Sequence, residues 1–231
     1  MPVIVDYDAG NVRSVQRACE RANMQADISA DPETVANADR LIFPGVGSAA
    51  SAVDTLNNRG LNEAIRYFYG TGRPLLGICL GLQIAVIDFA RDVLGKAGAN
   101  STEFDEGTPH PAVIFMPEGS RTHMGGTMRL GSRQTNLQTQ DCAAFRLYHG
   151  EMEIHERHRH RYEVNPDMVT ELEAAGMRFV GKDTEGERME IIELADHPYF
   201  FATQYHPEFK SRPNRPSPPF VGLIEAALDA Q

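Results

Sequence analysis

The chain lacks any excess of positive charge: its 231 residues carry 22 Lys and Arg against 32 Asp and Glu, which gives a net charge of −10. Binding to nucleic acid requires a basic surface, so this composition argues against a nucleic-acid partner. No apolar run is long enough to cross a bilayer, and residues 1–6 show neither the basic region nor the long apolar region of a signal peptide. We therefore expect a cytoplasmic protein that has no membrane partner.

Cysteine is also scarce, and the three thiols, Cys19, Cys79 and Cys142, lie far apart in the sequence. An odd number of scattered cysteines argues against a disulfide framework and suits a reducing compartment. Neither an internal repeat nor a linker divides the chain, whose content of 42% hydrophobic and 23% charged residues is ordinary for a globular protein. We expect a single domain that spans residues 1–231.

The order of the apolar segments predicts the fold class. Short buried strands are expected at 3–5, 26–29, 40–43 and 75–78, and helical patterns lie between and after them at 12–22, 48–56, 61–69 and 82–93. Later segments at 114–116, 128–130, 135–139 and 189–194 are typical of antiparallel strands, followed by a last strand at 200–204 and a closing helix at 220–228. This order predicts an α/β fold, an open, mostly parallel, flavodoxin-like sheet flanked by helices, with an added antiparallel region.

Cys79 lies where a predicted strand turns into a helix. The apolar run Leu75–Ile78 ends there, and apolar residues then recur at the spacing of one helix face: Leu82, Ala85, Val86, Phe89 and Val93. Gly77 and Gly81 flank the cysteine as they flank the serine of a nucleophile elbow, a turn that leaves no room for their side chains. The sulfur would stand at a helix N-terminus, where the dipole favours an anion. The alternative interpretation is that Cys79 is simply a buried core cysteine at a strand–helix junction.

A second set of polar residues follows the last predicted strand. His206, Pro207 and Glu208 follow it, separated from its last residue, Gln204, by Tyr205 alone. If this strand shares a sheet with the Cys79 strand, the imidazole could take the thiol proton, while the carboxylate orients the imidazole. A lone His-Pro-Glu is usually a surface turn, so the interpretation depends on the pairing with Cys79.

The turn Pro44-Gly-Val-Gly47 follows another predicted strand, at the end where open parallel sheets bind ligands. Such a turn can direct main-chain N–H groups toward an oxyanion, although a plain strand–helix turn would look the same.

His155, His158 and His160 raise the question of a metal site. A strand would put His158 and His160 on one face, but arginines alternate with them and no closed set of ligands lies at metal-binding spacing. We expect neither a metal nor a cofactor. On the opposite face, Arg159 and Arg161 could clamp a carboxylate or could simply form an exposed basic strand.

With these motifs in hand, the whole chain resembles the class I (triad) glutamine amidotransferases. From about residue 100 onward it is similar to the glutaminase domain of CTP synthase, on five stretches: 100–104, 124–131, 156–166, 186–190 and 204–209. Residues 1 to about 80 are similar to the glutaminase subunit of imidazole glycerol phosphate synthase, on Asp6-Tyr7, Gly10-Asn11, Arg13–Val15, Pro44–Gly47 and Pro74–Gly81.

This resemblance implies a glutaminase that hydrolyses L-glutamine to glutamate and ammonia. Cys79 would form a thioester, His206 would act as base and then acid, and Glu208 would orient it. No stretch resembles the ATP- and UTP-binding synthetase domain of CTP synthase. We therefore expect the ammonia to pass to a separate synthase partner. The resemblance implies that the whole reaction is similar to that of CTP synthase, an enzyme of pyrimidine biosynthesis.

The resemblance also implies a substrate-binding set. The oxyanion hole would come from the main-chain N–H groups of Leu80 and of the Gly45-Val46 turn. Gln83, Glu103 and Arg161 would hold glutamine, with Glu103 at the α-ammonium group and Arg161 at the α-carboxylate.

Three alternatives stay open at this point. The chain could be the glutaminase subunit of imidazole glycerol phosphate synthase. It could also be a catalytically silent regulatory subunit whose Gly45–Gly47 turn never forms an oxyanion hole. A γ-glutamyl peptidase would share the elbow, but Glu103 and Arg161 suit free glutamine better.

Overall fold

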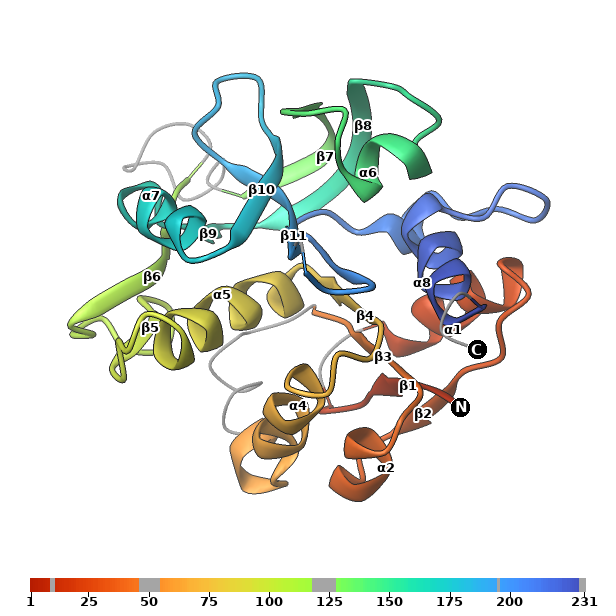
Figure 1. Ribbon diagram of the computed structural model, residues 1–231, viewed down its shortest axis with the longest axis horizontal. Coiled ribbons are helices and arrows are strands. Elements are labelled where there is room, and N and C mark those ends of the chain that lie inside the picture. The colour runs from red at the N-terminus through yellow and green to blue at the C-terminus, as the bar shows by residue number, and fades with distance from the viewer. Residues whose placement is uncertain (9–10, 46–54, 118–127, 195, 229–231) are drawn as a thin grey trace.

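The computed structural model describes residues 1–8, 11–45, 55–117, 128–194 and 196–228. A nine-stranded sheet in the order β2-β1-β3-β4-β12-β11-β10-β7-β8 forms the centre of the molecule, and a three-stranded sheet, β5-β6-β9, lies beside it (Figure 1). The mixed α/β architecture that the sequence predicts is therefore confirmed. Among the described residues, no helix is both long enough and apolar enough to span a membrane.

One half of the large sheet is parallel. It consists of β1 (Pro2–Val5), β2 (Asp27–Ser29), β3 (Arg40–Phe43), β4 (Leu75–Ile78) and β12 (Phe200–Thr203). Apart from the edge strand β2, these strands are short, mostly apolar runs because helices cover both faces. The covering helices are α1 (Val12–Arg21), α2 (Pro32–Ala36), α4 (Leu61–Tyr69), α5 (Leu80–Asp92) and α8 (Pro218–Leu228). The expected helix at 48–56 falls mostly outside the described residues.

The other half of the large sheet is antiparallel. It consists of β11 (Met189–Leu194), β10 (Met177–Lys182), β7 (Arg129–Leu137) and β8 (Glu153–His160). The sequence predicted two strands, at 128–130 and 135–139, and this prediction is wrong. Gly131 reads as a break, yet pairing with β8 runs unbroken from Arg129 to Asn136. Cross-strand pairing therefore overrides the local turn signal.

The remaining elements surround this antiparallel half. They are β5 (Ala99–Ser101), β6 (His110–Phe115), α6 (Ala143–Leu147), β9 (Tyr162–Val164), α7 (Pro166–Ala174) and the short 3-10 helix η2 (Pro207–Phe209).

Helix α5 differs from its predicted form. The sequence indicated one apolar face, but the helix is buried nearly all round between two apolar clusters. Leu80 and Ile84 pack with β3 and α4, whereas Leu82 and Val86 pack with β11, β12 and the small sheet. Val93, expected on the apolar face, is 54% exposed at the end of the helix. The start of α5 is thus fixed from two sides, which is what positions the residue before it.

Candidate functional site

Cys79 occupies a strained turn between β4 and α5. Its φ of 55° and ψ of −102° lie in a region that side-chain-bearing residues rarely adopt. The turn is held because the Cys79 N–H donates to the Thr203 carbonyl at 2.6 Å, and the Cys79 carbonyl accepts from the N–H groups of Leu82 and Gln83. The sulfur is therefore presented at the first turn of α5, as a nucleophile elbow requires.

The two flanking glycines are required by neighbouring strands as well as by the turn. A Cβ on Gly81 would lie 2.3 Å from the carbonyl oxygen of Phe43 in β3. A Cβ on Gly77 would lie 3.0 Å from the Cβ of Ala202 in β12. The elbow is therefore wedged between both strands next to β4, and the sequence pattern alone could not reveal these contacts.

We expect Gly81→Ala to destabilise the protein by about 2–4 kcal/mol, because the new methyl group meets backbone that cannot move aside easily. Urea unfolding followed by circular dichroism measures this loss. Gly70→Ala is the matched control, since its Cβ would meet only the Tyr67 carbonyl, at an ordinary 3.5 Å. Equal unfolding midpoints for the two variants would contradict the proposed wedge.

His206 and Glu208 meet as the sequence predicts. Nδ1 of His206 lies 2.9 Å from a carboxylate oxygen of Glu208, and both side chains are buried. The main-chain N–H of His206 donates to the Arg157 carbonyl at 2.8 Å, and the Phe209 ring stacks on the imidazole with centroids 5.0 Å apart. The main-chain bond fixes the backbone of His206, and contacts with Glu208 and Phe209 fix the orientation of its ring.

The charge state of His206 depends on Cys79. Burial by itself would lower the pKa of His206, but the interactions with Cys79 and then Glu208 outweigh it and raise the pKa to about 10. Nε2 forms no hydrogen bond of ordinary geometry to any described residue. The structure thus brings thiol, imidazole and carboxylate together, with Nδ1 of His206 on Glu208 and Nε2 left for the interaction with Cys79.

The predicted oxyanion turn approaches the elbow from β3. A Cβ on Gly45 would lie 2.3 Å from the main-chain nitrogen of Leu80, so the two backbones touch. The Tyr7 hydroxyl donates to the Pro44 carbonyl at 2.5 Å and thereby anchors the start of the turn. Val46, the other predicted donor, lies outside the described residues, as does Gly47.

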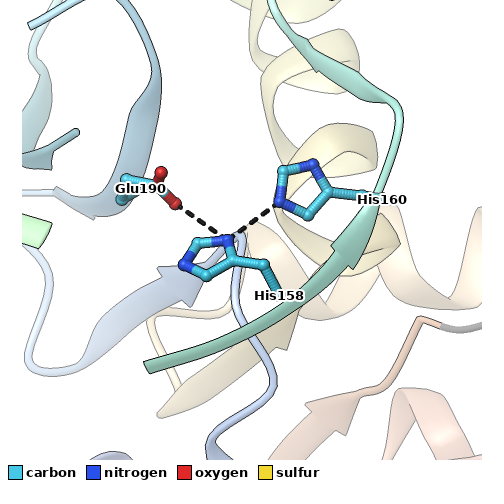
Figure 2. Close-up of side chains that lie close together, drawn as sticks. All are labelled: His158, His160 and Glu190. Carbon is cyan, nitrogen blue, oxygen red and sulfur yellow. Dashed lines mark hydrogen bonds and ion pairs between the residues drawn. The ribbon is translucent and has the colours of Figure 1, made fainter. Parts of the chain in front are cut away.

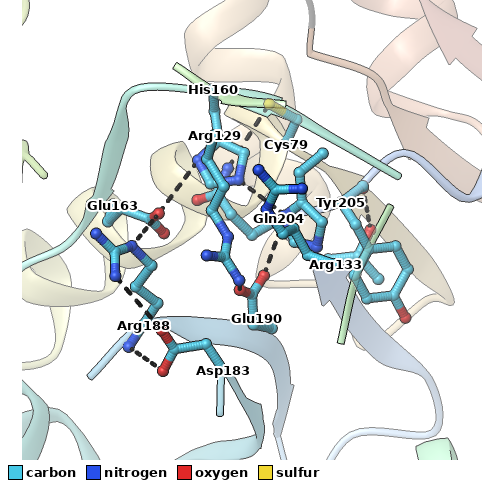
Figure 3. Close-up of polar contacts among 12 residues, drawn as sticks. Cys79, Arg129, Arg133, His160, Glu163, Asp183, Arg188, Glu190, Gln204 and Tyr205 are labelled. Carbon is cyan, nitrogen blue, oxygen red and sulfur yellow. Dashed lines mark hydrogen bonds and ion pairs between the residues drawn. The ribbon is translucent and has the colours of Figure 1, made fainter. Parts of the chain in front are cut away.

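Two amide side chains connect the elbow to the small sheet. Gln83, predicted to bind substrate, donates from Nε2 to the Tyr162 carbonyl at 2.9 Å and to the Gln204 amide oxygen at 3.3 Å. Gln204 in turn donates from Nε2 to the Cys79 sulfur at 3.6 Å (Figure 3). No pattern in the sequence singles out Gln204, because only the fold reveals that its side chain contacts the sulfur.

Glu103 and Arg161, predicted as the two substrate clamps, are both close enough to Tyr162 to affect its ionisation. Burial raises the pKa of Tyr162 most, the charges of Glu103 and then Glu106 raise it further, and the Arg161 charge opposes them. Arg161 is exposed and Glu103 is half-buried. Charges of opposite sign therefore flank the residue whose carbonyl holds Gln83.

The histidines of β8 separate as a strand predicts, with His155 exposed and His158 and His160 buried. Figure 2 shows the last two with Glu190: Nδ1 of His158 lies 2.9 Å from Nε2 of His160 and 3.3 Å from Glu190. These atoms lie within 4.8 Å of one another, a spacing that could hold a metal.

The contacts of this cluster also fit a polar network that holds no metal. His158 Nδ1 and His160 Nε2 share one hydrogen bond, and His160 Nδ1 faces Glu163 at 3.4 Å. Burial lowers the pKa of both imidazoles, which favours their neutral forms. Arg129 already pairs with Glu190 at 3.0 Å, so a further cation would meet an arginine already in place. The contacts therefore favour a structural polar network under His206.

A family model described as "Glutamine amidotransferase class-I" matches residues 3–226. Xenopus laevis CTP synthase 1-A is 57% identical over 169 residues, which are 73% of this chain and 29% of that protein. Dictyostelium discoideum CTP synthase is 56% identical over 179 residues, 74% of this chain and 32% of that protein. The chain thus spans about a third of the length of these curated relatives.

Two solved structures share the fold. The glutaminase domain of Trypanosoma brucei CTPS, determined with bound acivicin, superposes with a TM-score of 0.85 at 29% identity and covers 99% of this chain and 93% of that one. A crystal structure of a glutamine amidotransferase superposes with a TM-score of 0.61 at 15% identity, covering 97% and 98%. The second match supports the fold alone. The likeness of residues 1 to about 80 to imidazole glycerol phosphate synthase stays a prediction.

Proposed function

The chain belongs to the class-I glutamine amidotransferase family, and we propose that it hydrolyses L-glutamine to glutamate and ammonia through a thioester on Cys79. The observation that carries this proposal is the geometry around His206: its Nδ1 lies 2.9 Å from the Glu208 carboxylate, both side chains are buried, and the ring interacts with Cys79, which with Glu208 raises the pKa of His206. A charged imidazole beside a thiol is the arrangement that generates a thiolate nucleophile and stores a proton for the leaving group.

The reaction then follows in two steps. The Cys79 thiolate attacks the side-chain amide carbon, and the oxyanion that forms is stabilised by the Leu80 N–H. His206 gives its proton to the amide nitrogen, so the carbon–nitrogen bond breaks and ammonia leaves. Neutral His206 next takes a proton from water, whose oxygen attacks the thioester, and glutamate leaves as the thiolate is restored. Glu208 keeps the imidazole in the tautomer that both steps require.

We assign glutamine binding to Glu103 and Arg161, because a free amino acid needs one protein group of each sign. The opposite charges near Tyr162 support this assignment, as does the Gln83 side chain that connects Tyr162 to the elbow. Gly45 and Val46 would complete the oxyanion hole.

We expect Arg161→Leu to raise KM for glutamine by about tenfold or more, since it removes a charge-assisted bond to the α-carboxylate. The value of kcat should change much less, because the reacting amide lies at the other end of the substrate. Arg159→Leu is the control, as it removes another exposed arginine only two residues away in the chain. Equal KM values for the two variants would contradict the clamp.

We further propose that residues 1–231 act as one amidotransferase domain that delivers ammonia to a synthase partner. The CTP synthases among its relatives make a CTP synthase-like synthetase the first partner to test. Glutamate and ammonia release should be measured for the chain alone and with that partner. Absence of release in both conditions would contradict the proposal and favour a silent subunit, whereas release only with an imidazole glycerol phosphate synthase cyclase would identify the other partner.

A further inference from the structure

Gln204 lies against the sulfur because of the strand pairing. Ile78 of β4 is in register with Thr203 of β12, so Cys79 and Gln204 are the next residues along two adjacent parallel strands. Gln204 is fully buried, and its main-chain N–H donates to the Glu190 carbonyl at 2.9 Å. Its amide nitrogen lies 3.6 Å from the sulfur, an ordinary length for a hydrogen bond to sulfur (Figure 3).

The direction of this amide is fixed by a chain of partners. A main-chain carbonyl can only accept, so the Gln83 atom that contacts the Tyr162 carbonyl at 2.9 Å must be its nitrogen. The second N–H of that nitrogen points to Gln204 at 3.3 Å, so the Gln204 atom there must be the oxygen. The remaining end of the Gln204 amide, the NH2 group, therefore faces the sulfur. The Tyr162 carbonyl thus determines that a donor and not an acceptor faces Cys79.

From this geometry we infer that Gln204 is a further catalytic residue, whose side-chain N–H stabilises the Cys79 thiolate, and that Gln83 is its positioning residue. The inference rests on the proposed function and deepens it. The sulfur is anionic twice in the cycle, before attack and again when the thioester breaks. An N–H donor to an anion is stronger than one to a neutral group, so it favours the thiolate at both points.

The inference gives Gln83 a role different from direct contact with substrate. With two N–H groups committed to Tyr162 and Gln204, its amide holds the neighbouring amide in one orientation. Loss of Gln83 would leave Gln204 free to turn its oxygen to the sulfur. A carboxylate at position 204 would place an acceptor there permanently.

The test measures alkylation of Cys79 by iodoacetamide against pH, with mass spectrometry to identify the modified thiol. In Gln204→Met, a neutral side chain of similar size that lacks the donor, we expect the alkylation rate near neutral pH to fall about tenfold and to recover at alkaline pH. Gln204→Glu should show a larger fall, and Gln83→Met a smaller one in the same direction. Thermal unfolding of each variant identifies any that fail to fold. If the buried carboxylate prevents Gln204→Glu from folding, the conclusion rests on Gln204→Met.

Glutamine turnover is measured in the same preparations. Shifted alkylation profiles with no turnover in the wild type would support the role of Gln204 while contradicting the proposed function. A Gln204→Met profile that superimposes on that of the wild type would overturn the inference, even with turnover intact. A lower kcat in Gln204→Met, with KM for glutamine unchanged, would support action on the sulfur, whereas a change in KM alone would overturn it.

Discussion

Replacing Cys79 with alanine is expected to reduce glutamate release by roughly 10⁴-fold or more, which amounts to complete loss in an ordinary assay. The thiol is the group that His206 and Gln204 both face, and alanine at this position can form no thioester. The smaller side chain leaves the main-chain bond from residue 79 to the Thr203 carbonyl in place, so folding should be preserved. Coupled detection of glutamate and ammonia measures the loss.

The control for this experiment is Cys142→Ala. Its thiol is half-buried and accepts a bond from the Phe145 N–H at the start of α6. We expect turnover by this variant to match that of the wild type. Retained glutamate release by Cys79→Ala, or an equal loss in Cys142→Ala, would contradict the assignment of the nucleophile.

Local patterns were sufficient to predict the parallel half of the fold. The observed bounds of Arg40–Phe43, Leu61–Tyr69 and Leu75–Ile78 match the expected ones, because each segment ends where its pattern changes: at Pro44, at Gly70 and at Cys79, respectively. The antiparallel half was harder to predict because its pairing is not local. The continuity of β7 past Gly131 comes from β8, which follows about twenty residues later in the chain and offers no signal of its register in the sequence.

The residues of the site also fall into two groups, those that local sequence patterns indicate and those that only tertiary contacts reveal. Cys79, His206 and Glu208 could be selected from the sequence, because each lies at a strand end next to a recognisable turn. Gln204 could not be selected, since its role depends on the orientation of an amide that Gln83 and the Tyr162 carbonyl set from other elements. Gly81 could be selected as a glycine of the elbow, but its close contact with Phe43 on a neighbouring strand could not be predicted. Tertiary contacts thus determine the part of the site that sequence motifs do not predict.

The second large effect is expected for Glu208→Gln, which should lower kcat/KM by roughly 10²–10⁴-fold. An amide at position 208 can donate to Nδ1 and so favour the wrong tautomer, and it no longer balances the charge of the imidazolium. Glu185→Gln, an exposed change on another turn, is the control and should leave kcat/KM unaltered. Comparable rates for the wild type and Glu208→Gln would show that Glu208 does not orient the base.

The same variant gives a stability test whose sign follows from the pKa of His206. Burial lowers that pKa, but Cys79 and Glu208 raise it to about 10, above the ordinary 6.5, so protonated His206 stabilises the fold. This contribution is complete below 6.5 and is lost as the pH rises through the folded-state pKa. Removing the Glu208 charge lowers the folded-state pKa. The difference in unfolding free energy between wild type and Glu208→Gln should therefore be largest in mildly acidic buffer and shrink toward pH 10. Urea unfolding across this range measures it, and a difference that grows with pH would contradict the imidazolium that the proposed mechanism requires.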